Sequence, residues 1–109
     1  MEFALTDEQL LVQEAAKEFS DGVLKSAYES IEKNNEIDDD IVKQLGECGF
    51  AGLPYPENIG GAGADYLTYV LAVEQICRNS RSVGSIIANN NLAVNCINKF
   101  GTDEQRAKY

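Results

Sequence analysis

The stretch that most constrains the fold is Arg81–Phe100, with the sequence RSVGSIIANNNLAVNCINKF. At about 100° per residue, its apolar side chains fall on nearly every side of a helix. They are Val83, Ile86, Ile87, Leu92, Val94, Cys96, Ile97 and Phe100. A helix that is apolar all round is buried rather than amphipathic. The pattern therefore predicts a central helix around which the rest of the chain packs.

Three consecutive asparagines, Asn89, Asn90 and Asn91, lie in the middle of this predicted helix. Three neighbours in a helix spread over about 200° of its circumference, so they cannot all face solvent on one side. At least one amide is expected to point inward and to need hydrogen-bond partners. The residues alone favour loops or a partner subunit as those partners over a bound ligand.

With 109 residues, of which 44% are hydrophobic and 25% charged, the chain has the size and composition of one globular domain, residues 1–109. No apolar run approaches the ~20 residues of a membrane span. The N-terminal sequence MEFALTDEQ lacks the basic and then apolar order of a secretory signal. A cytoplasmic protein is the resulting expectation.

The three cysteines, Cys48, Cys77 and Cys96, are an odd number in apolar surroundings, which favours buried reduced thiols over disulfides. The chain has no histidine and no Cys-x-x-Cys pair, so a zinc or transition-metal site is not expected. The lack of histidine also removes the commonest general base.

The net charge of −9 arises entirely within residues 1–40, which hold twelve acidic and three basic residues. Residues 41–109 hold six of each. An acidic first third repels phosphate backbones and anionic lipids, so neither nucleic acid nor a membrane surface is an expected partner. A solvated helix face accounts for most of these carboxylates.

Helix signals recur along the chain and predict an all-α, antiparallel bundle of about five helices. A capping box at Thr6 and Gln9 opens one long helix, or two nearly collinear ones, over about residues 7–33. Asp38, Asp39 and Asp40 favour the capped start of a short helix, because the ligand spacing of a calcium loop is missing. A second capping box at Thr102 opens a last helix that has barely begun at the end of the sequence, which looks like a truncation point.

The helix that follows Asp65, the residue predicted to cap it, carries a predicted apolar face. This face consists of Tyr66, Tyr69, Val70, Val73, Ile76 and Cys77. Before it, residues 50–56 are predicted to be extended, since each proline pushes its predecessor away from the α region. Glycines at 60, 61 and 63 indicate positive φ angles or close backbone approach in a surface loop. A dinucleotide-binding loop is rejected, because no strand precedes these glycines.

Three sequence blocks together resemble the acyl-CoA dehydrogenase flavoprotein family. They are LTDEQ, LGECGFAGLPYPENIGGAGADYLTYVLAVEQI and FGTDEQRAKY, and the second is the most diagnostic. Their order and spacing are similar to the N-terminal helical domain of that family, over essentially the whole chain.

The resemblance implies a larger flavoprotein, with a β-domain and a second helical domain that hold FAD and the catalytic glutamate. The implied reaction is α,β-desaturation of an acyl-CoA thioester, with FAD as oxidant. Electron-transferring flavoprotein is the implied acceptor, and a homo-oligomer the implied assembly. No catalytic or cofactor-binding residue is expected in this chain, and Glu57 and Glu74 are expected to be solvated.

The resemblance further implies that the middle of the helix over residues 81–100 lines the acyl-chain pocket, at Ala88, Asn89 and Leu92. The asparagines are most similar to short-chain, butyryl-CoA dehydrogenase-type members. Burying an unpaired amide costs about 1–3 kcal/mol, so a long alkyl tail is disfavoured. Two alternatives stay open: a stand-alone interaction or dimerisation module, and a family relative that acts as an oxidase or reduces an enoyl-CoA.

Overall fold

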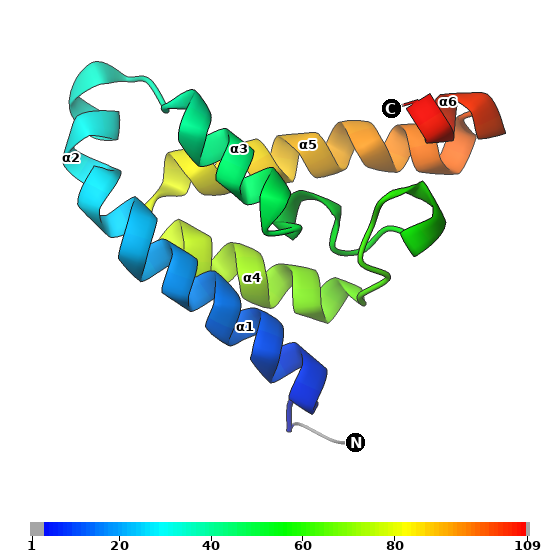
Figure 1. Cartoon of the computed structure of the whole chain (residues 1–109), viewed down its shortest axis with the longest axis horizontal. Coiled ribbons are helices and arrows are strands. Elements are labelled where there is room, and N and C mark those ends of the chain that lie inside the picture. Colours follow the sequence, from blue (N-terminus) through cyan, green and yellow to red (C-terminus); the bar gives the residue numbers. More distant parts are fainter. Residues whose placement is uncertain (1–3, 109) are drawn as a thin grey trace.

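The structure is a computed structural model that describes residues 4–108, and helices account for its regular structure (Figure 1). No strand occurs within this range. Its elements are α1 (Asp7–Phe19), a π-helical turn η1 (Ser20–Leu24), α2 (Lys25–Asn34), α3 (Asp39–Glu47), the 3-10 turns η2 (Phe50–Gly52) and η3 (Glu57–Ile59), α4 (Tyr66–Asn79), α5 (Arg81–Phe100) and α6 (Asp103–Lys108). The predicted all-α class is confirmed.

The first helical run is continuous from α1 through η1 into α2, as predicted, although its middle is a π turn. The capping box is present: the Thr6 hydroxyl accepts from the Gln9 amide at 3.2 Å, and Gln9 Oε1 accepts from the Thr6 amide at 2.9 Å. The run ends at Asn35, whose φ of +52° is left-handed. The predicted short helix also forms and begins after Asp38, but the Asp38 side chain makes no cap hydrogen bond.

The prediction that residues 50–56 are extended is wrong for the first part of that segment. Phe50 begins the 3-10 turn η2, and Leu53 is helical with φ −51° and ψ −50° although Pro54 follows it. Burial explains the difference, because this curl places Phe50 and Leu53 in the core, at 3% and 5% exposure. The ring of Phe50 meets that of Phe19 edge to face, with centroids 5.8 Å apart.

The glycine-rich segment is an ordered loop that folds back on the preceding chain, as predicted. Gly63 N–H donates to the Tyr55 carbonyl at 2.8 Å, and Ala64 N–H to the Leu53 carbonyl at 2.8 Å. Gly61 passes so close to Tyr55 that a Cβ on it would lie 2.2 Å from the Tyr55 carbonyl oxygen. Gly60 and Gly63 have φ angles of +94° and +66°. Only glycine accommodates these conditions without strain.

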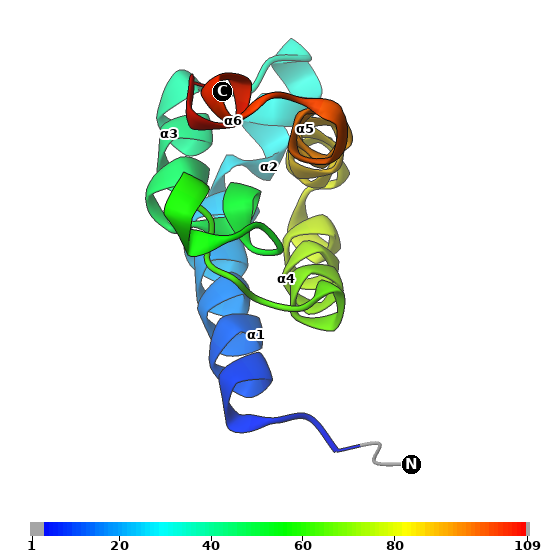
Figure 2. The same cartoon turned by 90° about the vertical axis from the view of Figure 1, so that its right-hand side faces the viewer.

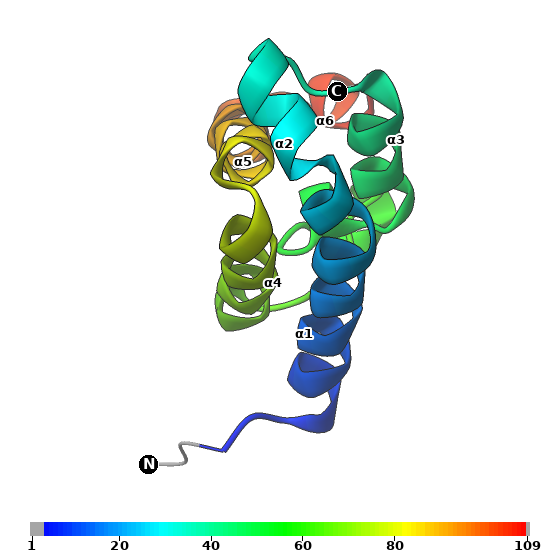
Figure 3. The same ribbon diagram turned by 90° about the vertical axis from the view of Figure 1, so that its left-hand side faces the viewer.

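The helices form two layers that enclose the core. Figures 2 and 3 show α1 and α3 on one side, α4 and α5 on the other, and the loop between them. α4 packs on both α1 and α5. It runs in the same direction as α1, and α5 runs back in the opposite direction (Figure 1). The core side chains that are least exposed come from both layers: Ala16, Leu24, Leu45, Ala72, Ile76, Val83 and Ile87.

The buried face of α4 is rotated from the prediction. Tyr66 and Val70, predicted to be buried, are 56% and 52% exposed. The residues that face inward are Thr68, Leu71, Ala72 and Ile76. A helix with apolar residues on several sides has no single face that periodicity can select. The contact with α1 decides the orientation, and Asp65 caps α4 as predicted, accepting from the Thr68 amide at 2.8 Å.

Candidate functional site

The first half of α5 is anchored in the core. Ser80 caps it, because the Ser80 hydroxyl accepts from the Val83 amide at 3.3 Å, and Val83, Gly84 and Ile87 are buried. Gly84 packs against the sulfur of Cys77 from α4: a Cβ at Gly84 would lie 2.1 Å from Cys77 Sγ. The two helices therefore approach closely at this point.

The second half of α5 is not buried, so the prediction that the whole helix is buried is wrong. After Ile87, the buried positions of α5 end. Leu92 is 68% exposed and Phe100 is 79% exposed. The physical reason is geometric: a 20-residue helix is about 30 Å long, and the α1–α4 layers reach only its first half. Beyond that point η2, the loop and the short α6 lie against α5 within residues 4–108, and they leave Leu92 and Phe100 uncovered.

The three asparagines divide between inside and outside, as predicted. The Tyr55 hydroxyl donates to the Asn91 carbonyl oxygen at 2.9 Å and also meets Asn91 Oδ1. Asn90 is exposed as a residue, but its Nδ2 donates toward the loop, to the Ala51 carbonyl at 3.3 Å. Asn89 is exposed and makes no such bond. The loop before α4 therefore supplies the inward partners, which is the alternative that the residues alone favoured.

The residues predicted for the site, Ala88, Asn89 and Leu92, share one exposed side of α5. Leu92 lies three positions after Asn89 and four positions after Ala88. This spacing places the three side chains next to one another on the helix surface. Of these three residues, Asn89 supplies the polar group, its side-chain amide. None of the three lines the cavity that lies behind the helix, between α5 and the loop.

A half-open cavity of about 410 Å³ separates the inner side of α5 from the loop. Asn90, Val94, Ile97 and Asn98 line it from α5, and Tyr55, Gly61 and Arg106 line it from the other elements. Tyr55 is 4% exposed, and burial raises the pKa of its hydroxyl above 10.0, which keeps it a neutral donor. Sequence reasoning missed Tyr55, since only the loop conformation brings it to Asn91.

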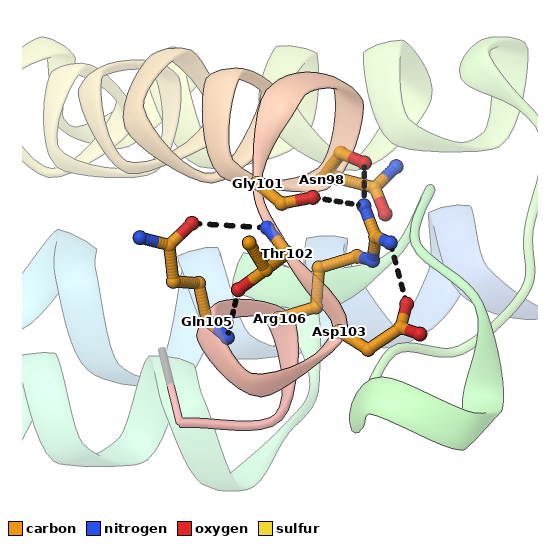
Figure 4. A network of polar contacts seen from close by, with 6 residues as sticks. All are labelled: Asn98, Gly101, Thr102, Asp103, Gln105 and Arg106. Carbon is orange, nitrogen blue, oxygen red and sulfur yellow. Dashed lines mark hydrogen bonds and ion pairs between the residues drawn. The ribbon is translucent and has the colours of Figure 1, made fainter.

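Arg106 closes one end of this cavity and joins α6 to the end of α5. Its guanidinium donates to the carbonyl oxygens of Asn98 at 3.1 Å and Gly101 at 2.7 Å, and pairs with Asp103 at 2.6 Å (Figure 4). The second capping box is formed as predicted, between Thr102 and Gln105. A cation at these carbonyls complements the negative end of the α5 dipole. Arg106 thereby fixes how the chain leaves α5.

A polar link also joins the starts of α1 and α4. Gln9 is 7% exposed, and its Nε2 donates to Asp65 Oδ2 at 3.1 Å. Hydrogen bonds from the Thr68 hydroxyl and amide lower the pKa of Asp65 below 3.8. Glu57 and Glu74 are exposed, as expected.

The prediction of buried thiols is wrong, because Cys48, Cys77 and Cys96 are all exposed as whole residues and free. Cys48 lies at the end of α3, and Cys96 lies in the second half of α5, where no residue is buried. Cys77 is exposed as a residue although its sulfur lies beside Gly84. For Cys77, partial burial of the sulfur beside Gly84 still raises the pKa of the thiol. Within residues 4–108, no group of three metal-ligating side chains comes together, and no helix is long and apolar enough to cross a membrane.

These features define an all-helical domain whose longest helix leaves one side of its second half uncovered. The family model for the acyl-CoA dehydrogenase N-terminal domain matches residues 6–109. The chain therefore belongs to the acyl-CoA dehydrogenase family and forms its N-terminal domain.

Relatives agree with this assignment. The chain is 36% identical over 110 residues to the short-chain specific acyl-CoA dehydrogenase of Clostridium acetobutylicum, covering 100% of this chain and 29% of that protein. Among solved structures, butyryl-CoA dehydrogenase from Megasphaera elsdenii matches with a TM-score of 0.93 and 29% identity, covering 100% of this chain and 30% of that one.

A further match is a chain in the structure described as "Electron transferring flavoprotein of Acidaminococcus fermentans: Towards a mechanism of flavin-based electron bifurcation". The TM-score is 0.95 and the identity 37%, and the match covers 100% of the present chain and 29% of that chain. The present chain thus spans about 29% of the length of these relatives.

Proposed function

We propose that this domain is part of an FAD-dependent acyl-CoA dehydrogenase that oxidises an acyl-CoA thioester to the 2,3-enoyl-CoA. In this proposal, the side of α5 with Ala88, Asn89 and Leu92 forms part of the acyl-chain pocket. The observation that carries it is the exposure of this side, including Leu92 at 68%. Apolar side chains exposed together mark a surface that binds a ligand or another part of the protein.

Residues 4–108 do not by themselves fit FAD. The polar groups around the cavity behind α5 are already bonded to other protein atoms: the Tyr55 hydroxyl, the Asn90 amide and the Arg106 guanidinium. The proposal therefore assigns flavin binding mainly to parts of the parent protein outside this chain. It also assigns electron-transferring flavoprotein as the acceptor, supported by the name of a matching structure.

This chain would contribute binding and selectivity to that reaction rather than proton transfer. Its exposed side on α5 would exclude water from the alkyl chain through Ala88 and Leu92. Asn89 would place an amide where the end of the acyl chain arrives. Leaving that amide unpaired against a hydrocarbon costs about 1–3 kcal/mol, so short or polar-ended acyl groups are favoured.

The test is a series of acyl-CoA substrates of increasing length, assayed with the full-length protein that carries this domain. Asn89→Leu is expected to raise kcat/KM for long chains relative to short ones about ten-fold, the equivalent of 1.4 kcal/mol. Asn58→Leu, at an exposed loop position, is the matched control and should leave the ratio unchanged.

Two results would overturn the proposal. A wild-type protein that prefers long chains contradicts the role of Asn89. A stable colourless protein that oxidises no acyl-CoA supports the alternative of a helical interaction or dimerisation module.

A further inference from the structure

The middle of α5 is less buried than its start, and hydrogen bonds join it to the preceding loop. Buried positions on α5 end at Ile87, and beyond it the cavity of about 410 Å³ lies between the helix and the loop. In the interior of a protein, close packing normally fixes the position of a helix. Over the turn with Asn90 and Asn91, that constraint is weak, so individual polar contacts decide where the turn lies.

Tyr55 makes the main contact. Its hydroxyl reaches both the backbone carbonyl and the side-chain oxygen of Asn91, and its ring is almost completely buried. Asn90 adds a longer bond to the Ala51 carbonyl at 3.3 Å.

The backbone of Tyr55 is itself held in place. Gly63 N–H donates to its carbonyl at 2.8 Å, and Gly61 packs against the same carbonyl without a side chain. The glycine-rich loop is thus a rigid support that presents one hydroxyl to the helix.

We propose that Tyr55 is a positioning residue for acyl-chain selectivity, acting through Asn91 on the exposed side of α5. This inference rests on the proposed acyl-pocket role. Asn91 lies between Asn89 and Leu92 in the helix, so a rotation or shift of its turn moves both of them. Tyr55 lies behind the helix, and its hydroxyl bonds to Asn91 rather than to any of the proposed substrate-binding residues. Tyr55 acts only by fixing the direction in which the side chains of Asn89 and Leu92 point.

The test uses Tyr55→Phe in the full-length protein, with Tyr66→Phe as the matched control. Tyr66 is 56% exposed and lies on α4, so its hydroxyl should be dispensable. In Tyr55→Phe, amide hydrogen exchange over residues 91–100 is expected to become about ten-fold faster, with residues 83–87 unchanged. The ratio of kcat/KM between a four-carbon and an eight-carbon acyl-CoA is expected to change about ten-fold, with flavin absorbance unchanged.

Asn91→Ala tests the same contact from the other side, while leaving Tyr55 in the core. It removes the side-chain acceptor but leaves the Asn91 backbone carbonyl, so both effects are expected in the same direction and smaller. Tyr55→Phe in this background should add only the remainder, because the two substitutions remove parts of one contact. A loss of folding in one variant therefore leaves the other to decide.

Three outcomes would overturn the inference. The rate of amide hydrogen exchange could stay unchanged in Tyr55→Phe. It could also rise equally over the whole chain, and this second result would indicate a purely structural role. Local exchange could also rise while the selectivity ratio stays constant. A wild-type protein that processes no acyl-CoA would instead overturn the proposed function and the selectivity role with it, whereas the exchange result would still report whether Tyr55 holds the helix.

Discussion

Gly84 lies where α5 meets α4, and its environment allows a sharp test of the packing. A Cβ at this position would lie 2.1 Å from Cys77 Sγ, but 3.5 and 3.6 Å from the Cβ and Cα of Cys77. The last two distances are ordinary van der Waals contacts. The serious clash of Gly84→Ala is therefore with a single sulfur atom, and Cys77→Ala removes that atom.

The expected effects follow from two opposing contributions. Overpacking a core contact costs about 1–3 kcal/mol. Replacing glycine by alanine in a helix interior stabilises by about 1 kcal/mol. Gly84→Ala in the wild-type chain is therefore expected to lower the free energy of unfolding by up to about 2 kcal/mol. In the Cys77→Ala background the same substitution should raise it by about 1 kcal/mol, which reverses its sign.

The assay is urea unfolding of the wild type, both single variants and the double variant, under reducing conditions. Stabilities are compared from the midpoints, provided that the urea dependence of the free energy stays constant. Gly22→Ala is the control, because nothing lies within 4 Å of a Cβ at Gly22, and its effect should not depend on Cys77. An equal effect of Gly84→Ala in both backgrounds would show that the sulfur moves aside freely, and would refute the reasoning.

Three further predictions concern polar groups. Gln75→Met should raise the free energy of unfolding by about 1 kcal/mol, because Gln75 Oε1 is buried without a partner within residues 4–108. Thermal unfolding measures this effect, with Gln13→Met as the control. A destabilised Gln75→Met variant would contradict the argument. The lowered pKa of Asp65 means that its contribution to stability is present above pH 3.8 and is lost as pH falls from there through the folded-state pKa. Asp65→Asn should therefore flatten the acid limb of a stability–pH curve, and an unchanged slope would count against this. Arg106→Gln should speed amide exchange in α6 about ten-fold, since two carbonyls at the end of α5 lose their donor; unaltered protection would disprove it.

Local signals in the sequence were sufficient to predict a helix start where a side chain hydrogen-bonds to a backbone amide close to it in the chain. Thr6, Asp65 and Thr102 each bond an amide three residues ahead, so their helix starts could be predicted without knowing the fold. The glycine-rich loop was predictable for a similar reason, since positive φ angles are a property of the local backbone.

Predictions of burial held only in part: Ile76, Val83 and Ile87 are buried as predicted, whereas Tyr66 and Leu92 are not. Burial is decided by distant segments. Tyr66 and Leu71 are both apolar and lie on opposite sides of α4, but only Leu71 turns toward the core. Leu53 became helical before a proline because its side chain is buried among residues far away in sequence. Periodicity ranks faces by polarity, and it has no information when two faces are equally apolar.

For the candidate site, the sequence by itself determined that the middle of the longest helix carries three amides and that they could not all face one way. That conclusion needs only the 3.6-residue period of a helix. Tertiary structure decided which amides turn inward, because the choice depends on where the Tyr55 hydroxyl and the Ala51 carbonyl lie. A loop thirty-six residues from Asn91 supplies the Tyr55 contact, and no local rule of the sequence encodes that distance.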